Sequence, residues 1–144
     1  MTTEKQPIPI PPYDYRGENL RIQITAQNAT REAEEAEQCL YMARRLLEDL
    51  RKEGDPQSWQ SKERIAGQER VVTLVQQQAA AAREHARHAE NAARHFGANV
   101  PEDDTFEARS RTRMMVQAVI DKTRQARACR DEASRLSGLQ FARR

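Results

Sequence analysis

The chain has 144 residues, enough for one domain, and no shift in composition marks a second hydrophobic core. Its formal net charge is only +2, although charged residues make up 32% of it. Leu, Ile, Val and Phe together number only 23, which is low enough to raise the possibility of disorder. Disordered chains also carry a high net charge, however, and this chain does not. The 21 alanines, with many Glu, Gln and Arg residues, favour helix, so the composition predicts an all-α protein.

The sequence has no apolar run long enough to span a membrane, which would need about 18 residues or more. The N-terminal residues MTTEKQPIPIPP lack the charged-then-apolar order of a signal peptide. The expected location is therefore the cytoplasm, or a particle that is assembled there.

Residues 1–17 differ from the rest of the chain, because four prolines alternate with isoleucines in this segment. Proline fixes φ and restrains the residue before it, so the segment is predicted to be an extended arm close to polyproline II. One interpretation is a floppy terminal tail. The other is an arm that binds a partner through its exposed apolar and aromatic side chains, which are Ile8, Ile10, Tyr13 and Tyr15.

The segment 18–53 is predicted to be the first helix, because its apolar residues recur at steps of four and three. Its inward positions are Ile22, Ala26, Ala29, Ala33, Ala36, Leu40, Ala43, Leu47 and Leu50. Gly54 is expected to follow this helix in the left-handed conformation, Asp55 to cap the next helix, and Pro56 to take its first position. A turn this short predicts that the two helices lie antiparallel.

The segment 56–96 is predicted to be the second helix. Five alanines at alternating steps of three and four form a narrow stripe along it, which we call the alanine seam: Ala79, Ala82, Ala86, Ala89 and Ala93. The other inward positions are Ile65, Gln68, Val72, Val75 and Phe96. Folding the chain at the predicted turn places Leu47 opposite Ile65 and Ala33 opposite Ala79. Small residues therefore face small ones far from the turn, where the two helices should come closest.

Residues 98–104 are predicted to form the second loop. Gly97 is expected to end the second helix. Asp104 and Glu107 have the spacing of a capping box, with Asp in place of the usual Ser or Thr.

The segment 105–137 is predicted to be the third helix, ending at Gly138. Its inward positions are Ala108, Thr112, Met115, Val119, Lys122, Ala126, Cys129, Ala133 and Leu136. Residues 18–144 are thus expected to form one antiparallel, up-down-up three-helix bundle or coiled coil behind the Pro-rich arm.

A core built mainly from alanine should be only marginally stable. A buried methyl group contributes about 0.8 kcal/mol, against roughly 1.5–3 kcal/mol for a Leu or Phe side chain. Association with a protein partner or a second copy would add stability. Five apolar residues off the inward faces could make that contact, or could simply widen the internal stripe: Val71, Leu74, Met114, Val116 and Ile120.

No catalytic, cofactor or metal site is predicted. His85, His88 and His95 lie within about 80° on a helical wheel, but the first and last are nearly three turns apart. Phosphate-binding loops and nucleophile elbows are absent from the sequence. Cys39 and Cys129 are expected at a similar height in the bundle, where a disulfide is conceivable and reduced thiols are favoured.

Positive charge is concentrated near the C-terminus, where residues 105–144 contain ten Lys and Arg but only four Asp and Glu. Five arginines fall within about 80° on a helical wheel: Arg109, Arg113, Arg124, Arg127 and Arg135. This stripe could bind phosphate groups or an acidic surface. The alternative is a solvated face whose charges are balanced by the chain's own carboxylates.

These features favour a non-enzymatic structural or adaptor subunit that acts by protein–protein assembly, as a homo-oligomer or with another protein. The Ala- and Arg-rich composition suggests a bacterial or phage particle, or a secretion complex. The alternative is a nucleic-acid-binding accessory protein that uses the arginine stripe. It has less support, because the stripe lacks the aromatic residues that stack on bases. An enzyme is the third and least supported possibility.

Overall fold

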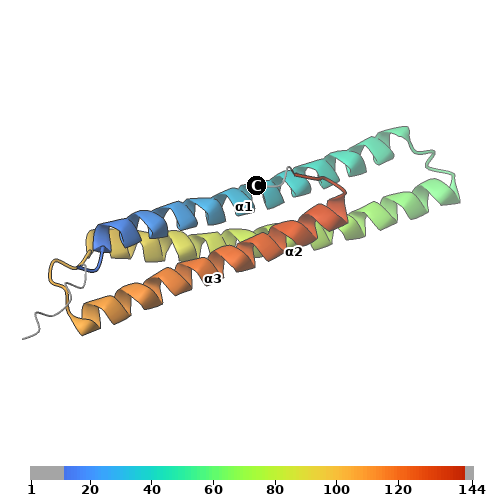
Figure 1. Cartoon of the computed structure of the whole chain (residues 1–144). Coiled ribbons are helices and arrows are strands. Elements are labelled where there is room, and N and C mark those ends of the chain that lie inside the picture. The colour runs from blue at the N-terminus through green and yellow to red at the C-terminus, as the bar shows by residue number, and fades with distance from the viewer. Residues whose placement is uncertain (1–11, 142–144) are drawn as a thin grey trace, which may run out of the picture.

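The computed structural model describes residues 12–141, which form three long helices and no strand (Figure 1). Helix α1 spans Tyr15–Glu53, α2 spans Trp59–Ala98 and α3 spans Phe106–Ser137. Each helix packs against the other two, and α2 runs opposite to α1 and α3. This confirms the predicted all-α, up-down-up three-helix bundle. None of the three helices is long and apolar enough to cross a membrane.

Helix α1 begins three residues earlier than predicted, inside the segment assigned to the arm. The carboxylate of Asp14 caps it by accepting a hydrogen bond from the backbone N–H of Gly17 at 2.8 Å. Of the predicted arm, residues 1–11 lie outside the described residues.

The turn between α1 and α2 is sharp, as predicted, but its capping residues are different. Gly54 is extended, with φ −72° and ψ 138°, rather than left-handed. A Cβ at Gly54 would lie 2.7 Å from the carbonyl oxygen of Leu50, which explains the glycine. The carboxylate of Asp55 stabilises the turn by accepting a hydrogen bond from the backbone N–H of Gln57 at 2.9 Å. Ser58 is the residue that caps α2.

Gly97 does not end α2, which continues to Ala98 with Asn99 as its cap. A Cβ at Gly97 would lie 3.1 Å from the side-chain nitrogen of Gln23 on α1. This glycine therefore permits a close approach of two helices rather than a change of chain direction.

Helix α3 is capped by Thr105, whose hydroxyl accepts from Ala108 N–H at 3.0 Å. The predicted capping box at Asp104 is wrong, because that carboxylate is engaged by Tyr15 and Arg109 instead. At the other end, α3 stops at the predicted residue.

The alanine seam is buried as predicted, with its five residues only 0–3% exposed. Every other predicted inward position is buried or partly buried. The two polar residues with long side chains in these rows, Gln68 and Lys122, are accommodated differently. Gln68 donates a hydrogen bond across to the carbonyl of Ala43 at 2.9 Å, whereas Lys122 bonds to Gln125 on its own helix at 3.3 Å.

The five apolar residues off the inward faces divide into two groups. Val116 is buried, and Val71 and Ile120 are partly buried against the core, so these three widen the internal stripe. Leu74 and Met114 stay exposed.

Candidate protein-interaction surface

Helix α3 ends beside the middle of α1. The hydroxyl of Ser137 lies near the thiol of Cys39, and Thr123 Oγ1 donates to the carbonyl of Thr25 at 3.1 Å. Both contacts join residues that are 98 positions apart, so no α3 residue lies beside α1 beyond about residue 40. Figure 1 shows the α1–α2 hairpin continuing past the end of α3. We call residues 41–70 the hairpin tip, and the rest of residues 12–141 the three-helix body.

The hairpin tip exposes large apolar side chains. Four of the nine exposed large hydrophobic residues in the described part of the chain lie there: Tyr41, Met42, Leu46 and Trp59. Only Ala43 and Leu47 are buried within the tip. This follows from geometry, because two helices can bury only the seam between them.

Met42 and Leu46 belong to the row of α1 that α3 covers inside the body. This row passes through Glu32, Glu35 and Cys39, all of which are buried. Steps of three and four continue it to Met42 and Leu46, which are 44% and 49% exposed. In the tip, this side of α1 is no longer covered by α3. We call the side of the tip that carries Met42 and Leu46 the open face.

A charged cluster between α1 and α3 was not predicted. The Arg130 guanidinium lies 3.2 Å from a carboxylate oxygen of Glu32 and 2.8 Å from those of Glu35 and Asp131. Glu32 is only 2% exposed, and the ring of Phe141 covers Arg130 with 5.8 Å between the ring centre and the guanidinium carbon. Arg130 of α3 thus pairs with two carboxylates of α1, so the cluster links these two helices.

Most of the predicted arginine stripe is neutralised within the chain. Arg109 forms a two-pronged ion pair with Asp104 at 2.5 and 2.6 Å. Arg127 Nε lies 3.3 Å from Glu32 of the charged cluster. These arginines have carboxylate partners and are poorly available to a phosphate backbone.

The other three arginines of the stripe differ among themselves. Arg135 is paired with Glu132. Arg113 lies over the ring of Tyr13 at 5.8 Å. Arg124 has no ion pair with any residue between 12 and 141. The structure thus supplies partners on the chain for four of the five.

The two tyrosines predicted for the binding arm contact the start of α3. Tyr15 Oη donates to Asp104 at 2.9 Å, and Tyr13 N–H donates to the same carboxylate at 3.3 Å. Arg109 is the main reason, with these two tyrosines, that the pKa of Asp104 lies well below its usual range. Burial and the bond to Asp104 raise the pKa of Tyr15. Both tyrosines therefore hold the start of α1 against the start of α3, while Ile8 and Ile10 lie outside the described residues.

The histidines do not come together with other ligands. Within residues 12–141 no group of three or more His, Cys, Asp or Glu side chains could hold a metal ion. His88 Nε2 lies 3.1 Å from Glu84. Burial, Lys122 and His88 lower the pKa of His85.

The two cysteines are free thiols, and the expected similar height is wrong. Cys39 lies beside Ser137, which is eight residues, or about 12 Å, along α3 from Cys129. A disulfide needs Cα atoms within about 7 Å. Burial raises the pKa of both thiols, which makes them less reactive.

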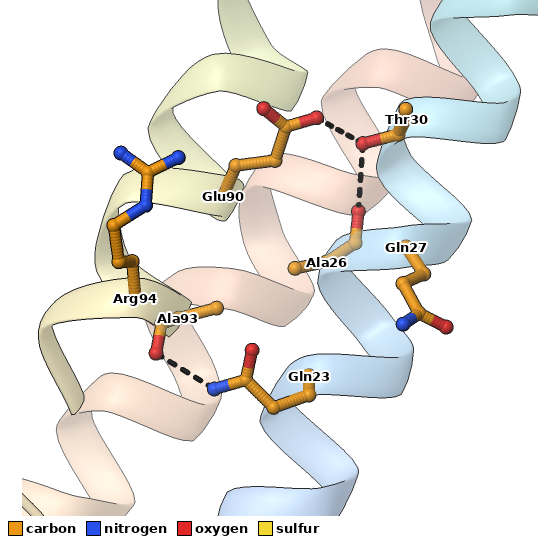
Figure 2. A pocket seen from close by; sticks show the side chains of 7 residues that line it. All are labelled: Gln23, Ala26, Gln27, Thr30, Glu90, Ala93 and Arg94. Carbon is orange, nitrogen blue, oxygen red and sulfur yellow. Dashed lines mark hydrogen bonds between the residues drawn. The ribbon is translucent and has the colours of Figure 1, made fainter. Parts of the chain in front are cut away.

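A shallow groove between α1 and α2 is lined by Gln23, Ala26, Gln27, Thr30, Glu90, Ala93 and Arg94 (Figure 2). Its polar groups already bond across the helices. Gln23 donates to the carbonyl of Ala93 at 2.7 Å, and Thr30 bonds to Glu90. These contacts hold α1 to α2 and leave few polar groups for a ligand.

Comparisons of the chain with known protein families, with curated proteins and with solved structures find no significant match in any of the three. The geometry of the chain is therefore the only basis for a functional proposal.

Proposed function

We propose that this chain is a non-enzymatic structural or adaptor subunit that acts by protein–protein assembly through its hairpin tip. The observation that carries the proposal is the row of Met42 and Leu46, which remains about half exposed on the side that α3 covers in the body. In the body the same row is buried under α3, so the tip resembles a three-helix bundle that lacks its third helix. Another protein can cover the tip in place of the third helix.

The composition of the core gives a physical reason for assembly. The alanine seam contributes about 0.8 kcal/mol per buried methyl group, so the isolated bundle gains little from each residue it buries. Covering the larger side chains of the tip would gain roughly 1.5–3 kcal/mol for each one that becomes fully buried. The assembly we envisage is a larger bacterial or phage complex put together in the cytoplasm, in keeping with the Ala- and Arg-rich sequence.

Nucleic-acid binding has less support, because four of the five arginines in the stripe have partners on the chain. Salt distinguishes the two functions. Binding to phosphate weakens steeply as salt is raised, whereas burial of apolar surface holds or strengthens.

A photo-crosslinking amino acid placed at position 46 tests the proposal in cells that make the full-length protein. The matched control carries the same amino acid at Met114, an exposed apolar position in the body. We expect strong adducts with protein from position 46 and few from position 114, and the adducts from position 46 should form equally well in about 1 M salt. Equal adducts from both positions, adducts with nucleic acid alone, or none from position 46 would contradict the proposal.

A further inference from the structure

The hairpin tip has a second uncovered row, on α2. This row includes His85, which lies about 160° around α2 from Arg83, the residue that pairs with Glu37 of α1, so His85 is on the side of α2 away from α1. Steps of four and three extend the row through Ala81, Gln78 and Leu74 to Val71 and then to Gly67. Beyond the end of α3, Gly67 is therefore on the same open face as Met42 and Leu46.

Gly67 has no packing role within the described chain. A Cβ there would meet no atom closer than the Arg70 guanidinium, at 3.8 Å. Glycine inside a helix is destabilising relative to alanine, and it is typically tolerated where another backbone approaches closely. Nothing between residues 12 and 141 makes that approach to Gly67.

The segment that follows α3 does not cover this face. After Gly138 the chain turns back, and the Phe141 ring lies 5.8 Å from Arg130, away from the tip (Figure 1). No segment between residues 12 and 141 therefore covers this face.

The charge of the tip suits a second copy of the same surface. Residues 41–70 contain seven Lys and Arg and six Asp and Glu. Two nearly neutral surfaces of mixed charge do not repel each other. A strongly charged partner would gain no electrostatic attraction from a nearly neutral surface.

The three-helix body determines whether two hairpin tips would pack parallel or antiparallel. The body fills the space over the open face at one end, so a second hairpin can lie on the tip only with its own body at the opposite end. Leu46 lies near the middle of residues 41–53, the part of the tip that belongs to α1. An antiparallel arrangement centred there places Leu46 opposite the same residue of the second copy.

We propose that the hairpin tips of two copies of this chain pack face to face and antiparallel, as an intermolecular four-helix bundle centred on Leu46 and Gly67. This inference rests on the proposed function and names its partner. Such a contact is two-fold symmetric and closed, which gives a dimer rather than a fibre. It is about 20 Å long and about 20 Å wide. This is smaller than the standard interface of roughly 800 Å² per partner, so a weak, micromolar dimer is expected.

Sedimentation velocity of the full-length protein from about 1 to about 100 µM tests this dimer. The decisive variant is Gly67→Leu, which blocks close approach but removes a helix-destabilising residue. We expect wild type to shift from monomer to dimer over this range, and Gly67→Leu to stay monomeric with an unchanged or higher melting temperature. The control is Ala66→Leu, an exposed position one residue away and about 100° around the helix, which should dimerise like wild type. A monomeric wild type, or equal dimerisation of both variants, overturns the inference.

Disulfide trapping tests the centre of the contact. In a Cys39→Ala, Cys129→Ala background, Leu46→Cys should form a covalent dimer under mild oxidation, whereas Met114→Cys should not. Equal cross-linking from both positions contradicts the antiparallel arrangement. If purified wild type is monomeric while the photo-crosslinker at position 46 still captures a different protein, the second copy is the wrong partner and the proposed function stands. If both experiments are negative, both proposals fall.

Discussion

In the three-helix body the smallest side chains are the most completely buried, whereas in the hairpin tip much larger ones are in contact with water. Ala33 and Ala86 have no exposed surface, but Leu46 is about half exposed. The difference does not follow hydrophobicity. It follows the number of helices around each position, since three helices enclose a shared core and two enclose only a seam.

The two regions also differ in how much apolar stabilisation they have already gained. The inward faces of the body are already buried, and along the alanine seam each buried methyl group contributes about 0.8 kcal/mol. The tip retains Met and Leu side chains whose burial is still incomplete. Substitutions in the body should therefore alter folding, and substitutions on the open face of the tip should mainly alter association.

The largest expected effect is in the body, at the charged cluster between α1 and α3. Arg130→Met leaves Glu32 and Glu35 buried without their main partner, and Arg127 on the rim of the cluster replaces it only in part. We expect a loss of about 3–5 kcal/mol in the free energy of unfolding, measured with urea.

Arg124→Met is the matched control for this change, because Arg124 has no ion pair among the described residues. It should shift stability by no more than about 0.5 kcal/mol. Similar losses in the two variants would mean that the cluster does not join α1 to α3 as described.

Two adjacent leucines of α1 in the tip allow buried and exposed positions to be compared within a single helix turn. Leu47 points into the seam and is 7% exposed, whereas Leu46 points to the open face. Leu47→Ala should cost about 2 kcal/mol or more, and Leu46→Ala less than about 1 kcal/mol, in urea unfolding at low protein concentration. Equal losses would show that Leu46 is already packed within the monomer.

A third pair of variants compares alanines on the two faces of α2. Ala86 is enclosed by the body, and a leucine there has no room, so Ala86→Leu should cost about 1–3 kcal/mol. Ala66 is exposed in the tip, and Ala66→Leu should change stability by less than about 0.5 kcal/mol. Thermal melts followed by circular dichroism provide the measurement, and a harmless Ala86→Leu would mean that the seam is loosely packed.

The fold could be predicted from sequence because the seam repeats at steps of three and four for many turns. The helix ends could not be placed as well, since neighbouring polar residues compete to cap them. Asp55 and Ser58 both suit the start of α2, and Asp104 and Thr105 both suit that of α3. Tertiary contacts decide between them: Asp104 is taken by Tyr15 and Arg109, which leaves Thr105 as the cap.

The proposed interaction surface depends on how α3 is aligned along α1, which the sequence alone does not determine. The predicted segments already made the third helix shorter than the second, but the open face depends on where α3 stops beside α1. The burial of Glu32 and Glu35 was missed for a different reason. Acidic residues beside a predicted core position are normally solvated, and only their partner Arg130 on a distant segment brings them inside.

The smallest expected effect is a pH dependence of the body that the tip should not share. Burial, with Lys122 across the helix interface and His88 on the same helix, lowers the pKa of His85 in the folded protein. The unfolded chain, with an ordinary histidine pKa of about 6.5, therefore takes up this proton first as the pH falls. The stability that neutral His85 contributes is fully present above about pH 6.5 and is lost as the pH drops toward the folded value.

Urea unfolding between about pH 7 and pH 5 should accordingly show wild type losing stability on acidification, and His85→Gln losing less. Lys122→Gln should also weaken the dependence, because it removes the second-largest cause of the shift. His88→Gln, at an exposed position beside Glu84, serves as the control and should keep most of the wild-type slope. If His88→Gln flattened the curve and His85→Gln did not, the exposed histidine would be responsible, and burial between α2 and α3 would have no part in the response to pH.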